Sequence, residues 1–306
     1  MRHETILVVG GTGFIGSHLV ARLAAEGRNV MLVTRRYDRA RPFLVLPTVQ
    51  IIEGDIFDEK FLYGLLPQAD ALINLVGVLH SKSGQPWGPQ FERAHVALPR
   101  LLAAACQKHG VKRCLHMSAL GAGAGAPSMY QRSKAEGEKI MLQASGLQVT
   151  SFRPSVVFGP EDQFLNLFAR LQFLLPVLAM GGLDAKFQPV YVGDVADAFV
   201  RALDEVSTYG KTYELPGPHI YTLRELIKLA GKYSGHERPL IALPRALARL
   251  QAWMLEYVPG GPLMSRDNID SMQADNVAHD EYPVPAVWQP VSLEAVAPTY
   301  LSPHSR

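Results

Sequence analysis

A tyrosine and a lysine lie four positions apart in the segment Tyr130-Gln131-Arg132-Ser133-Lys134. Residues with this spacing lie on one face of a helix, and a lysine ammonium beside a phenol lowers the phenol's pKa because it favours the charged form. Tyr130 could therefore donate or accept a proton near neutral pH, with Ser118 as a second polar group beside it. The alternative is that the pair marks only an exposed helix face.

A glycine motif lies near the start of the chain. It reads Gly10-Gly11-Thr12-Gly13-Phe14-Ile15-Gly16, with the spacing G-x-x-G-x-x-G, and follows a short apolar run. Glycines let a backbone turn tightly and approach a pyrophosphate, while a helix N-terminus favours the negative charge. The motif predicts a dinucleotide site, and the alternative is a tight turn without a ligand.

The residues after the second predicted strand bear on which dinucleotide would bind. An acidic residue there would bond the ribose 2′-hydroxyl of NAD, but this chain has Thr34, Arg35 and Arg36. Arginines can pair with the 2′-phosphate of NADP. The sequence thus favours NADP(H) and leaves NAD(H) open. Alternatively, both arginines belong to a solvated basic loop.

Apolar runs alternate with helical patterns through the first half of the chain. We predict strands at 6–9, 30–34, 49–52, 71–76, 114–117 and 149–152, and helices at 17–26 and 91–109. This alternation indicates an α/β fold with a Rossmann-type, doubly wound parallel sheet. We assign residues 1–160 to this dinucleotide-binding domain, with 187–205 returning to it. A smaller C-terminal α+β substrate or partner domain would comprise 161–186 and 206–306.

The composition excludes several classes of protein. The 306 residues carry 30 basic and 28 acidic side chains and are 48% hydrophobic, which argues against a nucleic-acid binder that relies on a strong positive field. Two cysteines, Cys106 and Cys114, and ten scattered histidines predict neither a disulfide scaffold nor a metal site. We find no signal peptide and no spanning helix, and expect a cytoplasmic protein, or one peripheral to the inner face of a membrane.

Taken together, these motifs resemble the short-chain dehydrogenases/reductases. Added to the glycine motif, Asn74-Leu75-Val76-Gly77 and the Tyr130/Lys134 pair, the segments 153–160 and 188–196 resemble the extended, epimerase/dehydratase-like branch. His116-Met117-Ser118-Ala119-Leu120-Gly121-Ala122 and Tyr213-Glu214-Leu215-Pro216-Gly217-Pro218 resemble an atypical subgroup. That subgroup contains the nucleotide-binding accessory subunit of respiratory complex I and its bacterial relatives.

The resemblance implies roles for matching residues. Tyr130 would be the acid/base group, Lys134 would tune it and bond the nicotinamide ribose, and Ser118 would polarise a substrate oxygen. The cofactor would contact Gly10, Thr12, Gly13, Phe14, Ile15, Gly16, Arg35, Arg36, Asp55, Ile56, Leu75, Val76, Gly77, Tyr130, Lys134, Pro154 and Val157. Within this set Asp55 and Ile56 would lie by the adenine, and Pro154 to Val157 would border the nicotinamide.

Three positions depart from the pattern of sugar-nucleotide enzymes. Ala119 stands where the catalytic Ser or Thr is common, and His95 and Val156 stand where asparagine is common. A packed or capped histidine is the simpler interpretation of His95. A valine cannot bond a polar substrate as asparagine does, so an ordinary sugar-nucleotide activity is not expected.

Two apolar segments carry open alternatives. Residues 164–180 could form a pocket or lid for a lipid-like substrate such as a quinone, a docking face for a membrane complex, or a buried helix. Residues 240–264, which contain Trp253, Met254, Leu255 and Tyr257, are interpreted first as core and loop and second as a membrane or partner surface.

Two functions follow as hypotheses. The first is an NADP(H)-dependent oxidoreductase or epimerase-like enzyme that moves hydride to or from a carbonyl or alcohol of a small molecule. The second is a non-catalytic NADP(H)-binding accessory or assembly protein, which could associate with a respiratory complex or a membrane. The sequence carries no indication of an oligomeric state.

Overall fold

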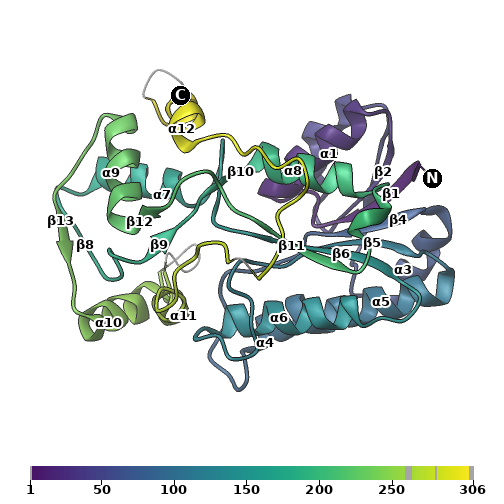
Figure 1. Cartoon of the computed structure of the whole chain (residues 1–306), viewed down its shortest axis with the longest axis horizontal. Helices are drawn as coiled ribbons and strands as arrows, with labels where there is room; N and C mark the ends of the chain where they lie inside the picture. Colours follow the sequence, from purple (N-terminus) through teal and green to yellow (C-terminus); the bar gives the residue numbers. More distant parts are fainter. Residues whose placement is uncertain (1, 259–263, 280, 303–306) are drawn as a thin grey trace.

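A parallel sheet of seven strands forms the centre of the computed structural model, which describes residues 2–258, 264–279 and 281–302 (Figure 1). In spatial order the strands are β11 (Lys211–Leu215), β6 (Gln148–Pro154), β5 (Arg113–Met117), β4 (Ala71–Asn74), β1 (Thr5–Val9), β2 (Asn29–Thr34) and β3 (Val49–Glu53). Strands buried on both faces read as continuous apolar runs. The predicted α/β fold is confirmed.

Helices cover both faces of this sheet, and the core divides accordingly. Ile6 and Val8 of β1 pack towards one face, whereas Leu7 and Val9 pack towards the other, as the alternation of side chains along a strand requires. The first face carries α1 (Phe14–Ala25), α2 (Tyr37–Ala40), η1 (Arg41–Val45) and α8 (Val192–Ala202). The second carries α3 (Glu59–Leu65), η2 (Leu66–Gln68), α5 (Leu98–His109) and α6 (Met129–Leu142).

The edge strand β11 differs from the expected partition of the chain. The sequence places residues 206–306 with the smaller domain, yet β11 pairs in parallel with β6 through residues 211–215. Only the short turn η4 (Val206–Thr208) and a few residues separate it from α8, and the Gly210 amide already donates to the Val149 carbonyl at 2.7 Å. The chain therefore returns to the large sheet a second time, between two passages through the smaller domain.

The smaller part of the molecule has its own apolar core, on the left of Figure 1. Its helices are α7 (Leu165–Leu174), α9 (Leu223–Ser234), α10 (Arg245–Leu255), α11 (Arg266–Ser271) and α12 (Leu293–Leu301). Its strand pairs are β8 (Leu178–Met180) with β13 (Leu240–Ala242), β9 (Lys186–Phe187) with β12 (Tyr221–Thr222), and β7 (Val157–Phe158) with β10 (Val190–Tyr191).

The two apolar segments with open alternatives have different outcomes. Residues 164–180 form α7 and β8, and Leu165 and Phe168 are buried in the core that α7 shares with α9 and α12, so the buried helix describes the inner face of α7. The end of α7 and the turn after it are exposed, with Phe173 and Leu174 at 58% and 60%. In residues 240–264 the preferred interpretation as core is wrong for α10, because Trp253 and Met254 are exposed. Residues 259–263 lie outside the described part of the chain.

Candidate dinucleotide and catalytic site

The glycine motif lies where the order of the strands reverses. β1 is flanked by β2 on one side and β4 on the other, with Val9 opposite Asn74, and in open α/β sheets ligands bind at this switch point. Gly10 has a φ of +83°, and a Cβ there would lie 3.0 Å from the Leu75 carbonyl carbon and the Val76 nitrogen. Only glycine lets the loop pack directly on the segment 75–77.

The same loop leaves the N-terminus of α1 open. Gly13 precedes the helix in an extended conformation, and no side chain caps the first amides. A Cβ at Gly16 would lie 2.5 Å from the Gly10 carbonyl oxygen, whereas one at the exposed Gly13 would meet only that oxygen, at 3.3 Å. The loop is therefore closely packed inside and bare outside, as an anion site on a helix N-terminus requires. The intervening Thr12, Phe14 and Ile15 are partly buried.

Two arginines extend from the end of β2. Thr34 is buried, and its Oγ1 both donates to the Arg36 carbonyl at 3.0 Å and accepts from the Arg36 amide at 3.2 Å. This small turn leaves Arg35 and Arg36 exposed, and neither guanidinium has an ion-pair or hydrogen-bond partner among the residues described here. Beside them, the Gly54 amide donates to the Thr34 carbonyl at 2.9 Å, so the ends of β2 and β3 are joined.

Asp55 and Ile56 follow β3 at that edge of the sheet. The Asp55 carboxylate accepts from the Phe57 amide at 3.1 Å and lies 3.6 Å from the Arg93 guanidinium. Ile56 is buried against the second face of the sheet. These contacts hold the loop in one conformation next to the exposed arginines.

Lys134 of α6 reaches the end of β5, next to Ser118. Lys134 is buried, and its Nζ donates to the Met117 carbonyl at 2.6 Å, one residue before Ser118. A Cβ at Gly77 would lie 3.7 Å from the same Nζ, so the lysine sits between the end of β5 and the segment that leaves β4. The buried Ser118 Oγ has no hydrogen-bond partner in the described chain. It is a polar atom that a ligand could satisfy.

The protonation of this pair differs from the sequence expectation. Burial raises the pKa of Tyr130 to about 12 and lowers the pKa of Lys134 to about 8, against the opposing charge of Glu138. The predicted lowering of the tyrosine pKa by Lys134 is therefore wrong for this structure. The reason is geometric: the ammonium is directed at the Met117 carbonyl, and no hydrogen bond joins it to the phenol.

His95 lies beside Tyr130 and is fully bonded. Its Nδ1 donates to Ser133 Oγ at 2.8 Å, Ser133 Oγ donates to the Tyr130 carbonyl, and Nε2 accepts from the Val78 amide at 3.0 Å. Burial, with Lys134 nearby, lowers the His95 pKa to about 2, so the ring is neutral. It sits in a π-helical turn, η3 (Glu92–Ala97), which follows the short helix α4 (Pro89–Phe91) and leads into α5. The interpretation of His95 as a packed histidine agrees with these contacts.

The end of β6 lies next to the segment that follows Ser118. Pro154 ends the strand, and its carbonyl accepts from the Leu120 amide at 2.9 Å. Val157 follows in β7, paired with Val190 of β10. The segment expected to border the nicotinamide is thus joined to the segment that follows Ser118.

Two residues from late in the chain enter this region, and sequence reasoning missed both. Asn276 Oδ1 accepts from Ser155 Oγ at 2.6 Å and from the Val156 amide at 3.2 Å, and its Nδ2 donates to the Leu120 carbonyl at 3.3 Å. An asparagine from a remote segment therefore supplies an amide beside position 156. Asp267 accepts from the Met129 and Tyr130 amides at 2.7 and 3.0 Å and so caps α6. No sequence motif indicates either residue, because the groups that each one bonds at this site lie more than 100 positions away in the chain.

A buried ion pair fixes α6 to β6. Arg153 donates to Glu138 through Nε at 3.0 Å and through Nη2 at 2.5 Å, and Ser151 Oγ donates to the same carboxylate at 2.8 Å. The Arg153 guanidinium also stacks 4.2 Å from the centre of the Tyr282 ring. Bidentate geometry of this kind holds the helix in one register, which positions Tyr130 and Lys134 on its preceding turns.

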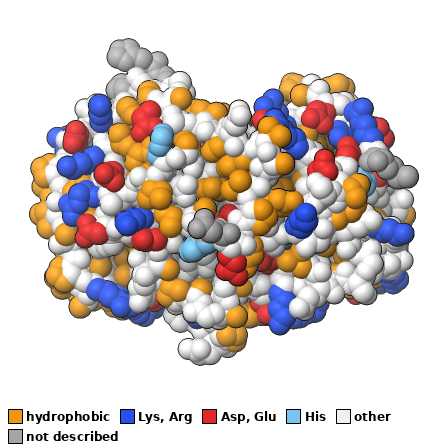
Figure 2. Space-filling view, viewed as in Figure 1, with side chains coloured by type: hydrophobic (Ala, Val, Ile, Leu, Met, Phe, Trp, Pro, Cys, Tyr) orange, Lys and Arg blue, Asp and Glu red, His pale blue; other side chains and the backbone are white. Residues whose placement is uncertain are grey.

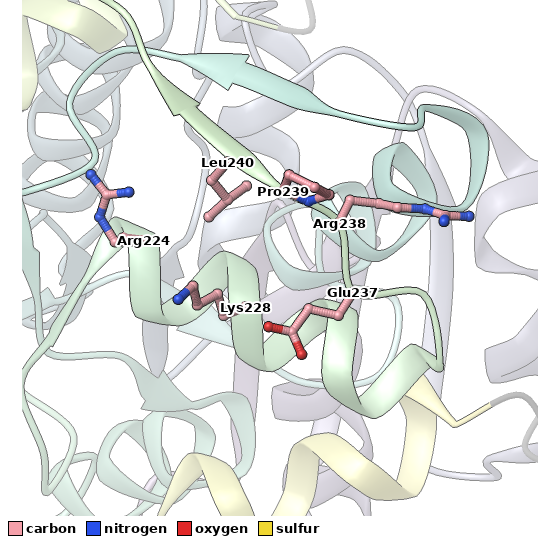
Figure 3. A pocket seen from close by; sticks show the side chains of 6 residues that line it. All are labelled: Arg224, Lys228, Glu237, Arg238, Pro239 and Leu240. Atoms are coloured by element: carbon pink, nitrogen blue, oxygen red, sulfur yellow. The ribbon is translucent and has the colours of Figure 1, made fainter.

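Other features lie outside the site. A surface hollow on the smaller domain is lined by Arg224, Lys228, Glu237, Arg238, Pro239 and Leu240 (Figure 3). In the described residues no cluster of histidine, cysteine or carboxylate side chains could hold a metal ion. No helix among them is long and apolar enough to span a membrane.

Comparison with known proteins identifies the class. The model of the NAD-dependent epimerase/dehydratase family matches residues 6–215, and the chain belongs to that family. It is 32% identical over 290 residues, 89% of this chain and 70% of the relative, to NADH dehydrogenase [ubiquinone] 1 alpha subcomplex subunit 9, mitochondrial, of Arabidopsis thaliana. It is 29% identical over 261 residues, 81% of this chain and 78% of the relative, to the ceramide reductase of Caulobacter vibrioides.

A solved structure shares the fold. DesIV, a dTDP-glucose 4,6-dehydratase from Streptomyces venezuelae with NAD and TYD bound, superposes with a TM-score of 0.75 at 20% identity, over 97% of this chain and 95% of the other. Nucleotide-binding oxidoreductase-like proteins and respiratory-complex subunits are thus both among the relatives of this chain.

Proposed function

We propose that this protein is an NADP(H)-dependent oxidoreductase that transfers hydride to or from the carbonyl or alcohol carbon of a weakly polar substrate. The observation that carries the proposal is the position of Lys134. Its Nζ bonds the end of β5 and adjoins Gly77 at the switch point of the sheet, on the helix that also bears Tyr130. This juxtaposition would bring an acid/base pair to the edge of a dinucleotide site.

The residues present fit a dinucleotide. The bare outer side of the glycine loop and the uncapped first turn of α1 suit a pyrophosphate. The unpaired Arg35 and Arg36 at the end of β2 suit a 2′-phosphate, whereas no carboxylate stands at that point to bond the 2′-hydroxyl of NAD. Asp55 and Ile56 would flank the adenine from the neighbouring loop.

The proposed chemistry divides between cofactor and protein. A bound nicotinamide would supply or accept the hydride. The Tyr130 phenol is protonated at neutral pH because burial raises its pKa to about 12, so in the reducing direction it would donate its proton to the substrate oxygen. Ser118 Oγ, which lacks a partner in the described chain, would donate a hydrogen bond to that oxygen. Lys134, whose Nζ adjoins Gly77, would bond the ribose of the bound nicotinamide.

Three observations support a weakly polar substrate. Val156 offers no side-chain hydrogen bond, and the polar atoms of the nearby Asn276 are already engaged with the protein. The rings of Phe91 and His95 pack around Tyr130, with centroids 5.9 and 5.5 Å away. One relative is named a ceramide reductase, which is an enzyme named for a lipid.

Tyr130→Phe tests the proposal. The assay follows NADPH oxidation with a panel of medium- and long-chain aldehydes and ketones, and NADPH binding is measured in parallel. We expect turnover to fall about 100-fold or more with unchanged NADPH affinity, because only the transferable proton is lost. Tyr63→Phe is the matched control, because Tyr63 is a partly buried tyrosine of α3 whose phenol bonds Glu59. Turnover of Tyr130→Phe at the parent rate would contradict the proposal.

A second candidate is a non-catalytic NADP(H)-binding subunit or assembly protein. It is favoured by the 32% identity to a respiratory-chain subunit over 89% of this chain and by Ala119 in place of a serine or threonine. A bound nucleotide would then stabilise the fold. Exchange of bound NADPH over hours, together with co-purification of respiratory complex I subunits, would favour this candidate. Exchange within seconds and turnover would favour the enzyme.

A further inference from the structure

Helix α10 has its apolar side chains on the outside. Its buried face consists of alanines, Ala248 and Ala252, which are 1% and 0% exposed. Five of the six large apolar side chains of the helix and its C-terminal turn are between 45% and 72% exposed: Leu247, Leu250, Trp253, Met254 and Tyr257. The sixth, Leu255, is partly buried. At 100° per residue the five exposed side chains fall within an arc of about 120°. A surface helix ordinarily has the reverse arrangement, and we call this exposed set the α10 stripe.

Positive charge borders the α10 stripe along one side. On the helix wheel Arg249 lies about 40° from the edge of the stripe, and Arg245 lies about 80° from it, on the side of Ala252. Their side chains are 40% and 60% exposed. The carboxylate that pairs with them, Asp270, is only 22% exposed, and Glu256 is held by Arg266 at 3.0 Å. The arginines are thus presented to the outside while the acidic groups are turned inward. Figure 2 shows hydrophobic and basic side chains together at the lower left, where Figure 1 places α10.

The size of the α10 stripe distinguishes between occupants. With five large side chains at 45–72% exposure, the α10 stripe presents accessible surface on the order of 500 Å². A stable protein interface needs about 800 Å² on each partner. A lipid surface has no such threshold, since it takes up individual apolar side chains and attracts nearby cations through its anionic headgroups.

We propose that α10 docks this protein onto an anionic lipid bilayer. The α10 stripe would enter the boundary between headgroups and acyl chains, with the helix lying in the plane of the membrane. Trp253 and Tyr257, whose ring centroids are 5.9 Å apart, are the two side-chain types that favour this boundary. Arg249, at the edge of the stripe and 40% exposed, would face lipid phosphates. This inference is independent of the proposed function, because none of these residues belongs to the dinucleotide site.

Vesicle flotation of the full chain tests the proposal. The probes are vesicles of phosphatidylcholine with 30% phosphatidylglycerol and vesicles of phosphatidylcholine alone. We expect binding to the anionic vesicles that weakens at high salt, and about tenfold or more weaker binding of the Leu250→Glu/Met254→Glu variant. Val45→Glu is the matched control, because Val45 is 82% exposed on the other domain and its replacement should leave binding unchanged.

The remaining outcomes are equally decisive. Parent-like thermal unfolding and NADPH affinity of the double variant would show that it is folded. Absence of binding to anionic vesicles would overturn the proposal, as would equal binding by the folded double variant. A parent dimer in sedimentation that the double variant abolishes, without vesicle binding, would assign the α10 stripe to a second copy of this chain and would also overturn it.

Discussion

Replacement of Lys134 by methionine should stabilise the protein at neutral pH while it removes the proposed function. Lys134 is 4% exposed, and burial lowers its pKa from 10.5 to about 8. At about 1.4 kcal/mol per pKa unit, the buried charge costs about 3 kcal/mol of folding free energy at pH 7. Loss of the charge-assisted hydrogen bond to the Met117 carbonyl costs about 1.5–3 kcal/mol. The net expectation for Lys134→Met is a gain of about 1 kcal/mol.

The sign of the pH dependence follows from linkage. Between about pH 8 and pH 10.5 the unfolded lysine binds a proton that the folded one does not, so the stability of the parent rises with pH in that window. The advantage of Lys134→Met should therefore shrink above pH 8 and reach zero at about pH 9. Urea unfolding at pH 7, 8, 9 and 10 measures the difference in unfolding free energy between Lys134→Met and the parent. The midpoint and the slope of each curve are compared at every pH.

A control separates burial from charge. Lys139 lies on the same helix and is exposed, so Lys139→Met should change stability by no more than about 0.5 kcal/mol at any of these pH values. If Lys134→Met is less stable than the parent at pH 7, or if the difference does not vary with pH, the account of Lys134 as a functional charge held at a cost in stability is wrong.

Further substitutions test the supporting structure. Glu138→Gln should destabilise the protein by about 3 kcal/mol in urea unfolding, since it breaks the buried pair with Arg153; a loss below about 1 kcal/mol would contradict this. Gly16→Ala should weaken NADPH binding in a fluorescence titration at least tenfold, because its Cβ would lie 2.5 Å from the Gly10 carbonyl; unchanged affinity would argue against the loop as the site. Gly64→Ala, in α3 with nothing within 4 Å of the new Cβ, should instead raise the free energy of unfolding by about 0.5–1 kcal/mol.

The parts of this structure that were predictable from sequence depend on local patterns. Six strands of the sheet, the glycine turn and the helix that bears Tyr130 and Lys134 are each encoded within a dozen residues. Strand β11 was assigned to the smaller domain because its pairing with β6 joins residues about 60 positions apart. Hydrophobic periodicity carries no information about such a partner.

In the candidate site, too, the features encoded in local motifs were predictable and those that depend on remote segments were not. The motif residues lie at the expected edge of the sheet, but the contacts of Asn276 and Asp267 with the site come from a segment without any pattern. The tyrosine pKa was predicted in the wrong direction because spacing places Lys134 on the same helix face without specifying where its ammonium points. In α10 the apolar residues were predictable, whereas their exposure depends on how Ala248 and Ala252 pack against the rest of the domain.

Titration of the purified protein with NADPH and NADH tests the central claim most directly. We predict tighter binding of NADPH, and a loss of about 10- to 100-fold in NADPH affinity alone for Arg35→Ala/Arg36→Ala, because charge-assisted hydrogen bonds to the 2′-phosphate are worth about 1.5–3 kcal/mol. Arg201→Ala, an exposed change on α8, should bind both nucleotides as the parent does. If neither nucleotide binds, the glycine motif is only a turn, and the proposed NADP(H)-dependent function is wrong.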